Sequence, residues 1–242
     1  MKDIFVTTDN VKRTLAALDP LCPALEQGLP PATGRGLVLL EGRTGTGKTM
    51  CCEWLATQLW YATYVRTMKL WNGPWMLEDL AAALGLAVRG SSKANLRAIQ
   101  EELRRRPRLI ILDEADRVVQ NLRLLETLRD IYDTTKCPIV MVSEGGGLAA
   151  IERKSPRTWR RLGQVVEYAT LSARDVQQLW AELAEVQAPL SLEQAEQVLK
   201  HSQGGSIGEV MVTLDELERK VRANPERGLT PKVMELAFRR AV

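Results

Sequence analysis

The sequence has little of what metal sites and disulfide frameworks are built from. Its only histidine is His201, and its four cysteines, Cys22, Cys51, Cys52 and Cys137, lack the C-x-x-C spacing of a zinc site. A structural metal site is therefore not expected. Vicinal cysteines can be redox-active, but Cys51 and Cys52 fall on a predicted helix, where we interpret them as small packing residues.

Membrane spans and export signals are also lacking. No stretch approaches the ~20 consecutive apolar residues that a membrane helix needs. Residues 1–10 include acidic side chains and no apolar core of a secretory signal, so we expect a cytoplasmic protein with no membrane partner. The 33 basic and 30 acidic residues leave a net charge of only +3, so nucleic-acid binding has to rest on local clusters.

The sequence does contain a regular alternation of strand and helix patterns. Short apolar runs predict buried strands at residues 36–42, 62–70, 109–112, 138–142 and 165–168. Apolar residues at helical spacing predict helices at 9–18, 48–60, 74–84, 93–105 and 118–133. This order predicts an α/β fold, a doubly wound parallel sheet whose ligand lies at the carboxyl ends of the strands.

The pattern becomes purely helical after residue 170. Ser172 stands three residues before Asp175, which is a helix-start signature. Further helices are predicted from Ser191, over residues 206–223 and over residues 231–241. We therefore predict two domains, an α/β nucleotide-binding core over residues 1–170 and a small helical lid over residues 171–242.

The segment after the first predicted strand carries the most specific motif. Residues 42–49, Gly-Arg-Thr-Gly-Thr-Gly-Lys-Thr, match G-x-x-x-x-G-K-[ST] at every position. In this motif glycines let backbone N–H groups converge on phosphates, the lysine bridges the β- and γ-phosphates, and the last hydroxyl ligates Mg²⁺. The sequence thus predicts ATP and Mg²⁺ as cofactors. The expected cofactor contacts are Gly42, Thr44, Gly45, Thr46, Gly47, Lys48, Thr49 and Met50.

Two acidic residues, Asp113 and Glu114, end the aliphatic run at 109–112. At the carboxyl end of a buried strand, Asp113 is expected to hold Mg²⁺ together with Thr49, and Glu114 to polarise the attacking water. The run Asp113–Asp116 also spells the letters D-E-A-D of a helicase family. Such helicases carry a second large motor domain, for which too few residues follow.

With these motifs the chain resembles an AAA+ ATPase, and more narrowly the transposition regulators of the MuB, TnsC and TniB type. The resemblance covers roughly residues 5–220 and rests on 42–49, 109–116, 128–133 followed by 138–142, and 159–163. It implies ATP-dependent assembly into a homo-oligomer, a helical filament or a ring, on duplex DNA of any sequence. It further implies target-site selection and recruitment or stimulation of a transposase.

The resemblance also implies that ATP lies between neighbouring subunits and that an arginine finger of one subunit reaches the γ-phosphate of the next. Arg161, which precedes an apolar residue and a glycine, matches the family's arginine, with Arg160 as the alternative and a solvated basic face as the simpler explanation. Ser143 is expected to act as the polar sensor of the γ-phosphate or water, beside Glu144, where AAA+ proteins usually have Asn or Thr. Residues 204–209 hold no second sensing arginine.

For DNA, the resemblance implies basic and hydroxyl residues on loops that grip phosphates. The candidates are Lys69, Arg89, Ser91, Ser92, Lys93 and Arg97, although ordinary solvated surface explains each one equally well. Trp71 and Trp75 flank a turn and either anchor it or pack on DNA. We expect Trp54, Trp60 and Trp180 to be core residues.

Two other functions stay open at this point. One is an AAA+ ATPase of the helicase-loader or clamp-loader kind, which acts on a replication protein. The other is a signalling or toxin-defence switch that hydrolyses ATP without nucleic acid; such switches usually carry effector and repeat domains that this sequence has no room for.

Overall fold

The computed structural model describes residues 1–202 and 205–238, which form two compact units. The first, which we call the sheet unit, comprises residues 13–42 and 48–168. The second, the helical unit, comprises residues 1–12, residues 43–47 and the described residues from Ala169 onward. The domain boundary at residue 170 stays a prediction. No helix in the described part of the chain is long and apolar enough to cross a membrane.

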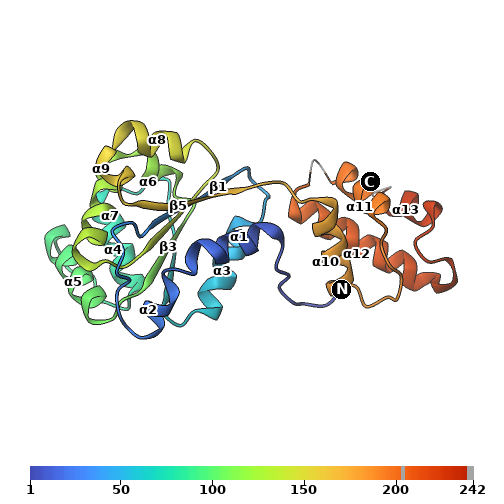
Figure 1. Cartoon of the computed structure of the whole chain (residues 1–242), viewed down its shortest axis with the longest axis horizontal. Coiled ribbons are helices and arrows are strands. Elements are labelled where there is room, and N and C mark those ends of the chain that lie inside the picture. The colour runs from blue at the N-terminus through green and yellow to red at the C-terminus, as the bar shows by residue number, and fades with distance from the viewer. Residues whose placement is uncertain (203–204, 239–242) are drawn as a thin grey trace. The chain divides into compact units, whose positions relative to one another are not determined.

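A five-stranded sheet forms the centre of the sheet unit (Figure 1). Its order is β2-β3-β4-β1-β5, and every neighbouring pair is parallel. The strands are β1 (Leu37–Gly42), β2 (Ala62–Arg66), β3 (Leu109–Asp113), β4 (Ile139–Ser143) and β5 (Leu162–Tyr168). The predicted α/β fold with a parallel sheet is confirmed.

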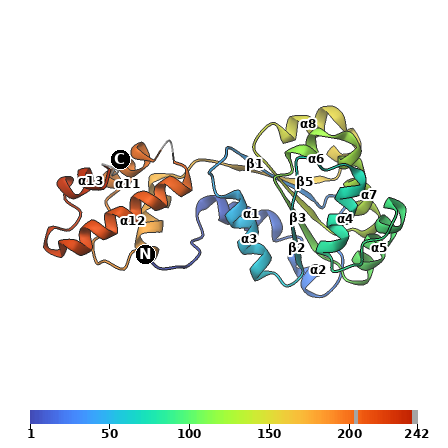
Figure 2. The same cartoon turned by 180° about the vertical axis from the view of Figure 1, so that it is seen from behind.

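Helices cover both faces of this sheet, as Figures 1 and 2 show from opposite sides. Helix α3 (Lys48–Gln58) lies on one face, and α4 (Gly73–Ala83), α5 (Ser92–Arg105) and α7 (Leu122–Thr135) lie on the other. Because both faces are covered, every residue of the central strands β3 and β4 is buried. Shorter helices complete the unit: α2 (Cys22–Glu26), α6 (Asp116–Gln120), α8 (Gly147–Lys154) and α9 (Pro156–Trp159).

The helix predicted over 118–133 is in fact two helices, α6 and α7. The Asn121 side chain accepts hydrogen bonds from the backbone N–H groups of Arg123 and Leu124. An asparagine in this role ends one helix and starts the next, because it satisfies N–H groups that have no partner within the new helix. Helices α8 and α9 were not predicted.

Strand β2 ends at Arg66, so the prediction of a strand to residue 70 is wrong. The Thr67 N–H still donates to the Asp113 carbonyl (2.9 Å), but its hydroxyl donates to the Glu114 carbonyl (2.5 Å) and the chain then turns away. Trp71 is buried and donates its indole N–H to Asp79 (2.6 Å). Trp71 therefore anchors the turn before α4.

The prediction that Trp60 is a core residue is also wrong. Helix α3 ends at Gln58, so Trp60 lies on the connection to β2 rather than on an apolar helix face, and it is 70% exposed. Trp180 is buried as predicted, whereas Trp54 is only partly buried.

The helical unit packs around α10 (Ala173–Leu183), α11 (Leu192–His201), α12 (Ile207–Ala223) and α13 (Pro231–Phe238), with a 3-10 turn at Pro225–Arg227. Val176, Trp180 and Leu214 are part of its apolar core. Both predicted helix starts are confirmed as capping boxes, Ser172 with Asp175 and Ser191 with Gln194. Helix α1 (Asp9–Leu18) begins in this unit and continues along the chain into the sheet unit. Residues 203–204 and 239–242 of the predicted lid lie outside the described residues.

Candidate nucleotide-binding site

The glycines of residues 42–49 stand where the backbone requires them. Gly45 and Gly47 have φ angles of +82° and +90°, which residues other than glycine rarely adopt. At Gly42, the last residue of β1, a β-carbon would clash with the Tyr168 carbonyl on the neighbouring strand. The local geometry is therefore that of a tight, glycine-dependent loop leaving a buried strand.

Within the helical unit this loop is held by the start of α12 and by Asn10. The Ile207 N–H donates to the Gly45 carbonyl (2.8 Å), and the Asn10 amide reaches the Thr46 carbonyl (3.4 Å). The Thr46 hydroxyl donates to the Arg43 carbonyl (2.8 Å), which closes the loop on itself. The loop is thus ordered by protein contacts.

Lys48 opens helix α3 with a buried side chain, and its ammonium donates to the Gly42 carbonyl. Burial lowers the pKa of Lys48, while the carboxylates of Glu144, Asp116 and Asp113 act in the opposite direction. A cation with little water around it, at a helix N-terminus, attracts an incoming phosphate oxygen strongly. Thr44, Thr49 and Met50 are exposed.

Asp113 ends β3 with a fully buried carboxylate. One oxygen accepts from the Tyr64 hydroxyl (2.8 Å) and the other from the Glu114 N–H (2.9 Å). Burial, followed by this bond to Asp113, raises the pKa of Tyr64. Sequence reasoning missed Tyr64; its position two residues before the end of β2 becomes informative only once β2 is known to pair with β3.

The side-chain oxygens of Asp113 and Thr49 are of the kind that binds Mg²⁺. Each carboxylate oxygen of Asp113 keeps a free lone pair after one hydrogen bond, and Thr49 offers a hydroxyl. Mg²⁺ is commonly bound through one or two such protein oxygens plus phosphate and water. No cluster of three or more His, Cys, Asp or Glu side chains that could hold a metal ion occurs among the described residues.

Glu114 has a left-handed backbone, φ +53°, which is uncommon for a residue other than glycine. Its carboxylate forms an ion pair with Arg66, the last residue of β2. Sequence reasoning missed Arg66 for the same reason as Tyr64, since only the pairing of Arg66 with Asp113 places it here.

Ser143 ends β4 and donates its hydroxyl to Asp116 (2.8 Å), which also accepts from the Glu144 N–H (3.0 Å). The strand register pairs Ser143 with Glu41, and Glu41 accepts from the N–H groups of Gly146 and Leu148. The structure thus brings Lys48, Asp113, Asp116 and Ser143 to one edge of the sheet. It adds Asp116, to which sequence reasoning gave no role.

Part of the chain matches a known protein family. A family model described as an AAA domain matches residues 32–151. Residues 32–151 form an AAA domain. No curated protein sequence matches this chain.

The solved structures that resemble the chain share the fold of this AAA domain. Orc2 of Aeropyrum pernix, in its ADPNP–ADP complexes, is 16% identical with a TM-score of 0.71, over 99% of this chain and 70% of that protein. Cdc6p of Pyrobaculum aerophilum is 19% identical with a TM-score of 0.65, over 93% and 65%. Orc1 of Aeropyrum pernix, in complex with DNA, is 17% identical with a TM-score of 0.64, over 98% and 65%. The fold is that of AAA+ P-loop NTPases.

Arg161 does not lie at the edge of the sheet that holds Lys48. Its carbonyl accepts from the N–H of Leu37, the first residue of β1, whereas the loop leaves the other end of that strand. At ~3.3 Å per residue the two ends lie about 17 Å apart. The Arg161 guanidinium is paired with Asp133 (2.6 Å), and this hydrogen bond raises the pKa of Arg161. Neighbouring Arg160 is exposed.

The candidate DNA residues of the AAA domain fall on two connections. Lys69 lies between β2 and α4. The connection from α4 to α5 carries Arg89 and Ser91, and the first turns of α5 carry Ser92, Lys93 and Arg97. Ser91 caps α5, since its hydroxyl accepts from the Ala94 N–H (3.2 Å). No hydrogen bond or ion pair of the described residues joins Lys69 to the other five.

Proposed function

We propose that this protein is a Mg²⁺-dependent ATPase that assembles into a homo-oligomer on duplex DNA. The observation that supports the proposal is the division of the candidate catalytic residues between two opposite edges of the sheet unit. Lys48, Asp113 and Ser143 lie at one edge of the sheet, and Arg160 and Arg161 lie at the other. A subunit with this division holds half of a hydrolytic site at each edge.

The ATP-binding half consists of the loop at residues 42–49. Its N–H groups and Lys48 hold the phosphates, with Thr44, Thr46 and Met50 along the nucleotide. Thr49 and Asp113 hold Mg²⁺, which neutralises charge on the phosphates when it is bound. The fixed carboxylate of Asp113 and the glycine-dependent turn support this assignment.

Hydrolysis requires a base for water and a cation for the charge that develops on the γ-phosphate. Glu114 supplies the base and Ser143, held by Asp116, orients the water or phosphate. Arg161 of a neighbouring subunit supplies the cation, because it lies too far from Lys48 to act within its own subunit. Bound ATP therefore joins two subunits, and its hydrolysis releases them.

Duplex DNA is the proposed scaffold of the oligomer, gripped by Lys69, Arg89, Ser91, Ser92, Lys93 and Arg97. Such contacts act on phosphates and carry no sequence preference. Support comes from the resemblance to transposition regulators and from the likeness of the fold to Orc1, whose structure is in complex with DNA.

The downstream partner of the proposed assembly is a transposase, on the strength of the resemblance over residues 5–220. A second candidate partner is a replication protein. The fold shared with Orc1, Orc2 and Cdc6p, at 16% to 19% identity, favours this alternative.

Assembly is tested by sedimentation and electron microscopy with duplex DNA and ATP, a non-hydrolysable analogue, or ADP. We expect large DNA-bound oligomers with the analogue, their loss with ADP, and none for Lys48→Ala. A protein that stays monomeric and unbound with the analogue contradicts the proposal. Affinity capture from the host then separates the two partners, since recovery of a replication protein without a transposase favours the second candidate.

A further inference from the structure

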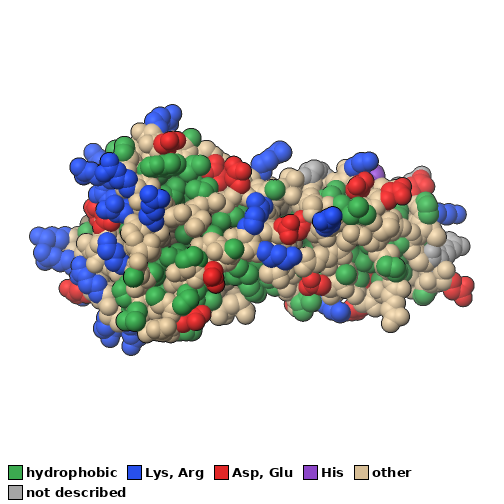
Figure 3. Space-filling model, viewed as in Figure 1, with side chains coloured by type: hydrophobic (Ala, Val, Ile, Leu, Met, Phe, Trp, Pro, Cys, Tyr) green, Lys and Arg blue, Asp and Glu red, His purple; other side chains and the backbone are tan. Residues whose placement is uncertain are grey.

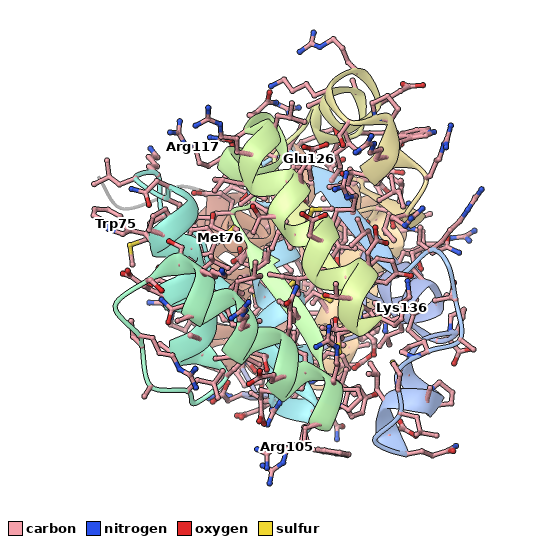
Figure 4. The ribbon with its side chains drawn as sticks, turned by 90° about the vertical axis from the view of Figure 1, so that its left-hand side faces the viewer. Trp75, Met76, Arg105, Arg117, Glu126 and Lys136 are labelled. Atoms are coloured by element: carbon pink, nitrogen blue, oxygen red, sulfur yellow. The ribbon has the colours of Figure 1, made fainter. Side chains whose placement is uncertain are left out.

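The edge of the sheet unit opposite Lys48 carries a dense group of cations. We call Arg104, Arg105, Arg106, Arg108 and Lys136 the basic edge. They come together because the ends of α5 and α7 are tied: the Arg104 Nε–H donates to the Thr134 carbonyl (3.2 Å), and the Cys137 thiol donates to the Leu103 carbonyl (3.4 Å). Arg105 and Lys136 are labelled in Figure 4, and blue side chains gather on the visible face of this unit in Figure 3.

The protein's own carboxylates leave most of this charge uncompensated. Arg105 pairs with Glu102 (2.6 Å). Arg104, Arg106, Arg108 and Lys136 make no ion pair with any acidic residue that the structure describes, and the Nε–H of Arg108 is buried without a partner. Stabilisation of a helix C-terminus accounts for Arg104 and Arg105, which lie in the last turn of α5. It does not account for Arg106 and Arg108, which lie at and beyond the helix end.

The strand beside Arg108 is preceded by an exposed tryptophan, Trp60. The Tyr61 carbonyl accepts from the Leu109 N–H (2.9 Å), so Trp60 and Tyr61 run alongside Pro107 and Arg108 at the start of β2 and β3. The Trp60 ring is 70% exposed and makes a T-shaped contact with the buried Tyr61 ring, with centroids 5.5 Å apart and planes at 87°. This contact restrains the indole while most of its surface remains accessible.

From this juxtaposition we infer that the basic edge, with Trp60, is a binding surface for single-stranded nucleic acid. A positively charged track with an exposed ring is the combination that grips phosphates while a base stacks. A duplex keeps its base faces covered, so an exposed ring of this kind favours a single strand. An acidic peptide would use the cations but has no use for the ring.

This surface contains no residue of the proposed function, although it shares the amino-terminal edge of the sheet with Arg160 and Arg161. It lies at the amino-terminal ends of β2, β3 and β4, whereas the nucleotide edge lies at their carboxyl ends. It also contains none of the six residues proposed to grip duplex DNA. Binding here therefore needs neither ATP nor oligomer assembly.

Fluorescence anisotropy with labelled oligo-dT and oligo-U, in nucleotide-free buffer at low salt, tests the inference. Trp60→Ala is expected to weaken binding by about tenfold, within the range for loss of one stacked base. Arg106→Glu is expected to weaken it at least as much and to flatten its salt dependence. The matched controls are Trp75→Ala, an exposed tryptophan at a different margin of the unit (Figure 4), and Arg153→Glu on α8; both should bind like the wild type.

Thermal melting should show all four variants folded like the wild type. Three results overturn the inference. The first is a wild type that binds no single strand, and the second is Trp60→Ala that binds the oligonucleotide as tightly as the wild type. The third is that poly-glutamate displaces the oligonucleotide and binds Trp60→Ala as tightly as it binds the wild type. ATP-dependent assembly on duplex DNA is measured separately and survives any of them, so the two proposals fail independently.

Discussion

Among individual residues of the proposed site, Glu114 is held most unusually. A left-handed backbone and an ion pair with Arg66 fix its carboxylate, and Thr67 donates to its carbonyl. The pair lies at the surface, where such contacts are weak enough to break during a reaction cycle. Arg66 thus restrains the proposed hydrolytic carboxylate without locking it.

Removing this restraint should accelerate ATP turnover. We expect Arg66→Ala to raise the basal rate of phosphate release several-fold, because Glu114 becomes free to approach water, and Arg66→Lys to stay near the wild-type rate. Steady-state phosphate release measures both. A rate for Arg66→Ala well below that of the wild type would show that Arg66 supports hydrolysis instead.

Lys48 and Glu114 should separate binding from turnover. Lys48→Ala should abolish binding of a fluorescent ATP analogue, since its buried ammonium, beside the Gly42 carbonyl, is the cation proposed to hold the phosphates. Glu114→Gln should bind the analogue like the wild type yet lose hydrolysis by about 10²-fold or more, the contribution expected of a general base. Equal loss of binding in both variants would contradict the assigned roles.

Among the elements, α10 depends on one carboxylate of its capping box. Asp175 accepts from the backbone N–H of Asp9, from the Ser172 N–H and from the Ser172 hydroxyl. Burial acts to raise the pKa of Asp175, but these hydrogen bonds outweigh it and the pKa is lowered. The start of α10 and the start of α1 therefore share one ionised acid.

The sign of the pH dependence follows from this lowered pKa. The stabilisation by Asp175 is present above its ordinary pKa of about 4 and is lost as the pH falls through the lowered folded value. Asp175→Asn should cost about 1 kcal/mol at pH 7, as for loss of a helix cap, and progressively less below about pH 4. Thermal melts at pH 7 and below about pH 4 measure the loss of stability. The control is Glu193→Gln, which changes an exposed first-turn acid of α11. An equal cost at both values would show that ionisation of Asp175 is irrelevant.

At the scale of the whole molecule, the proposed catalytic unit is an assembly of chains. Arg161, the arginine proposed to complete the γ-phosphate site, lies at the edge opposite Lys48 and is paired with Asp133. No change within one sheet unit brings the two edges of a packed parallel sheet together. Activity should therefore depend on protein concentration and on the scaffold.

Mixing variants tests this dependence. Arg161→Ala and Lys48→Ala should each lose hydrolysis, by about 10³-fold for the missing finger. Their mixture should recover part of the activity on duplex DNA, because one variant supplies intact ATP sites and the other intact arginines. Arg160→Ala should stay active, and a mixture that remains inactive would remove Arg161 from the trans role.

The sequence by itself determined the glycine-dependent loop at residues 42–49, the two acids at the end of β3, the parallel α/β class and the capped helices of the helical unit. These depend on local rules: glycine at positive φ, apolar runs that fill a covered sheet, and side chains that satisfy free N–H groups. The tertiary structure alone decided that Tyr64 and Arg66 contact Asp113 and Glu114, since this requires β2 to pair with β3. It also decided that Trp60 is exposed beside the arginines that precede β3. Contacts between residues far apart in the chain depend on strand order and register, and no local pattern encodes them.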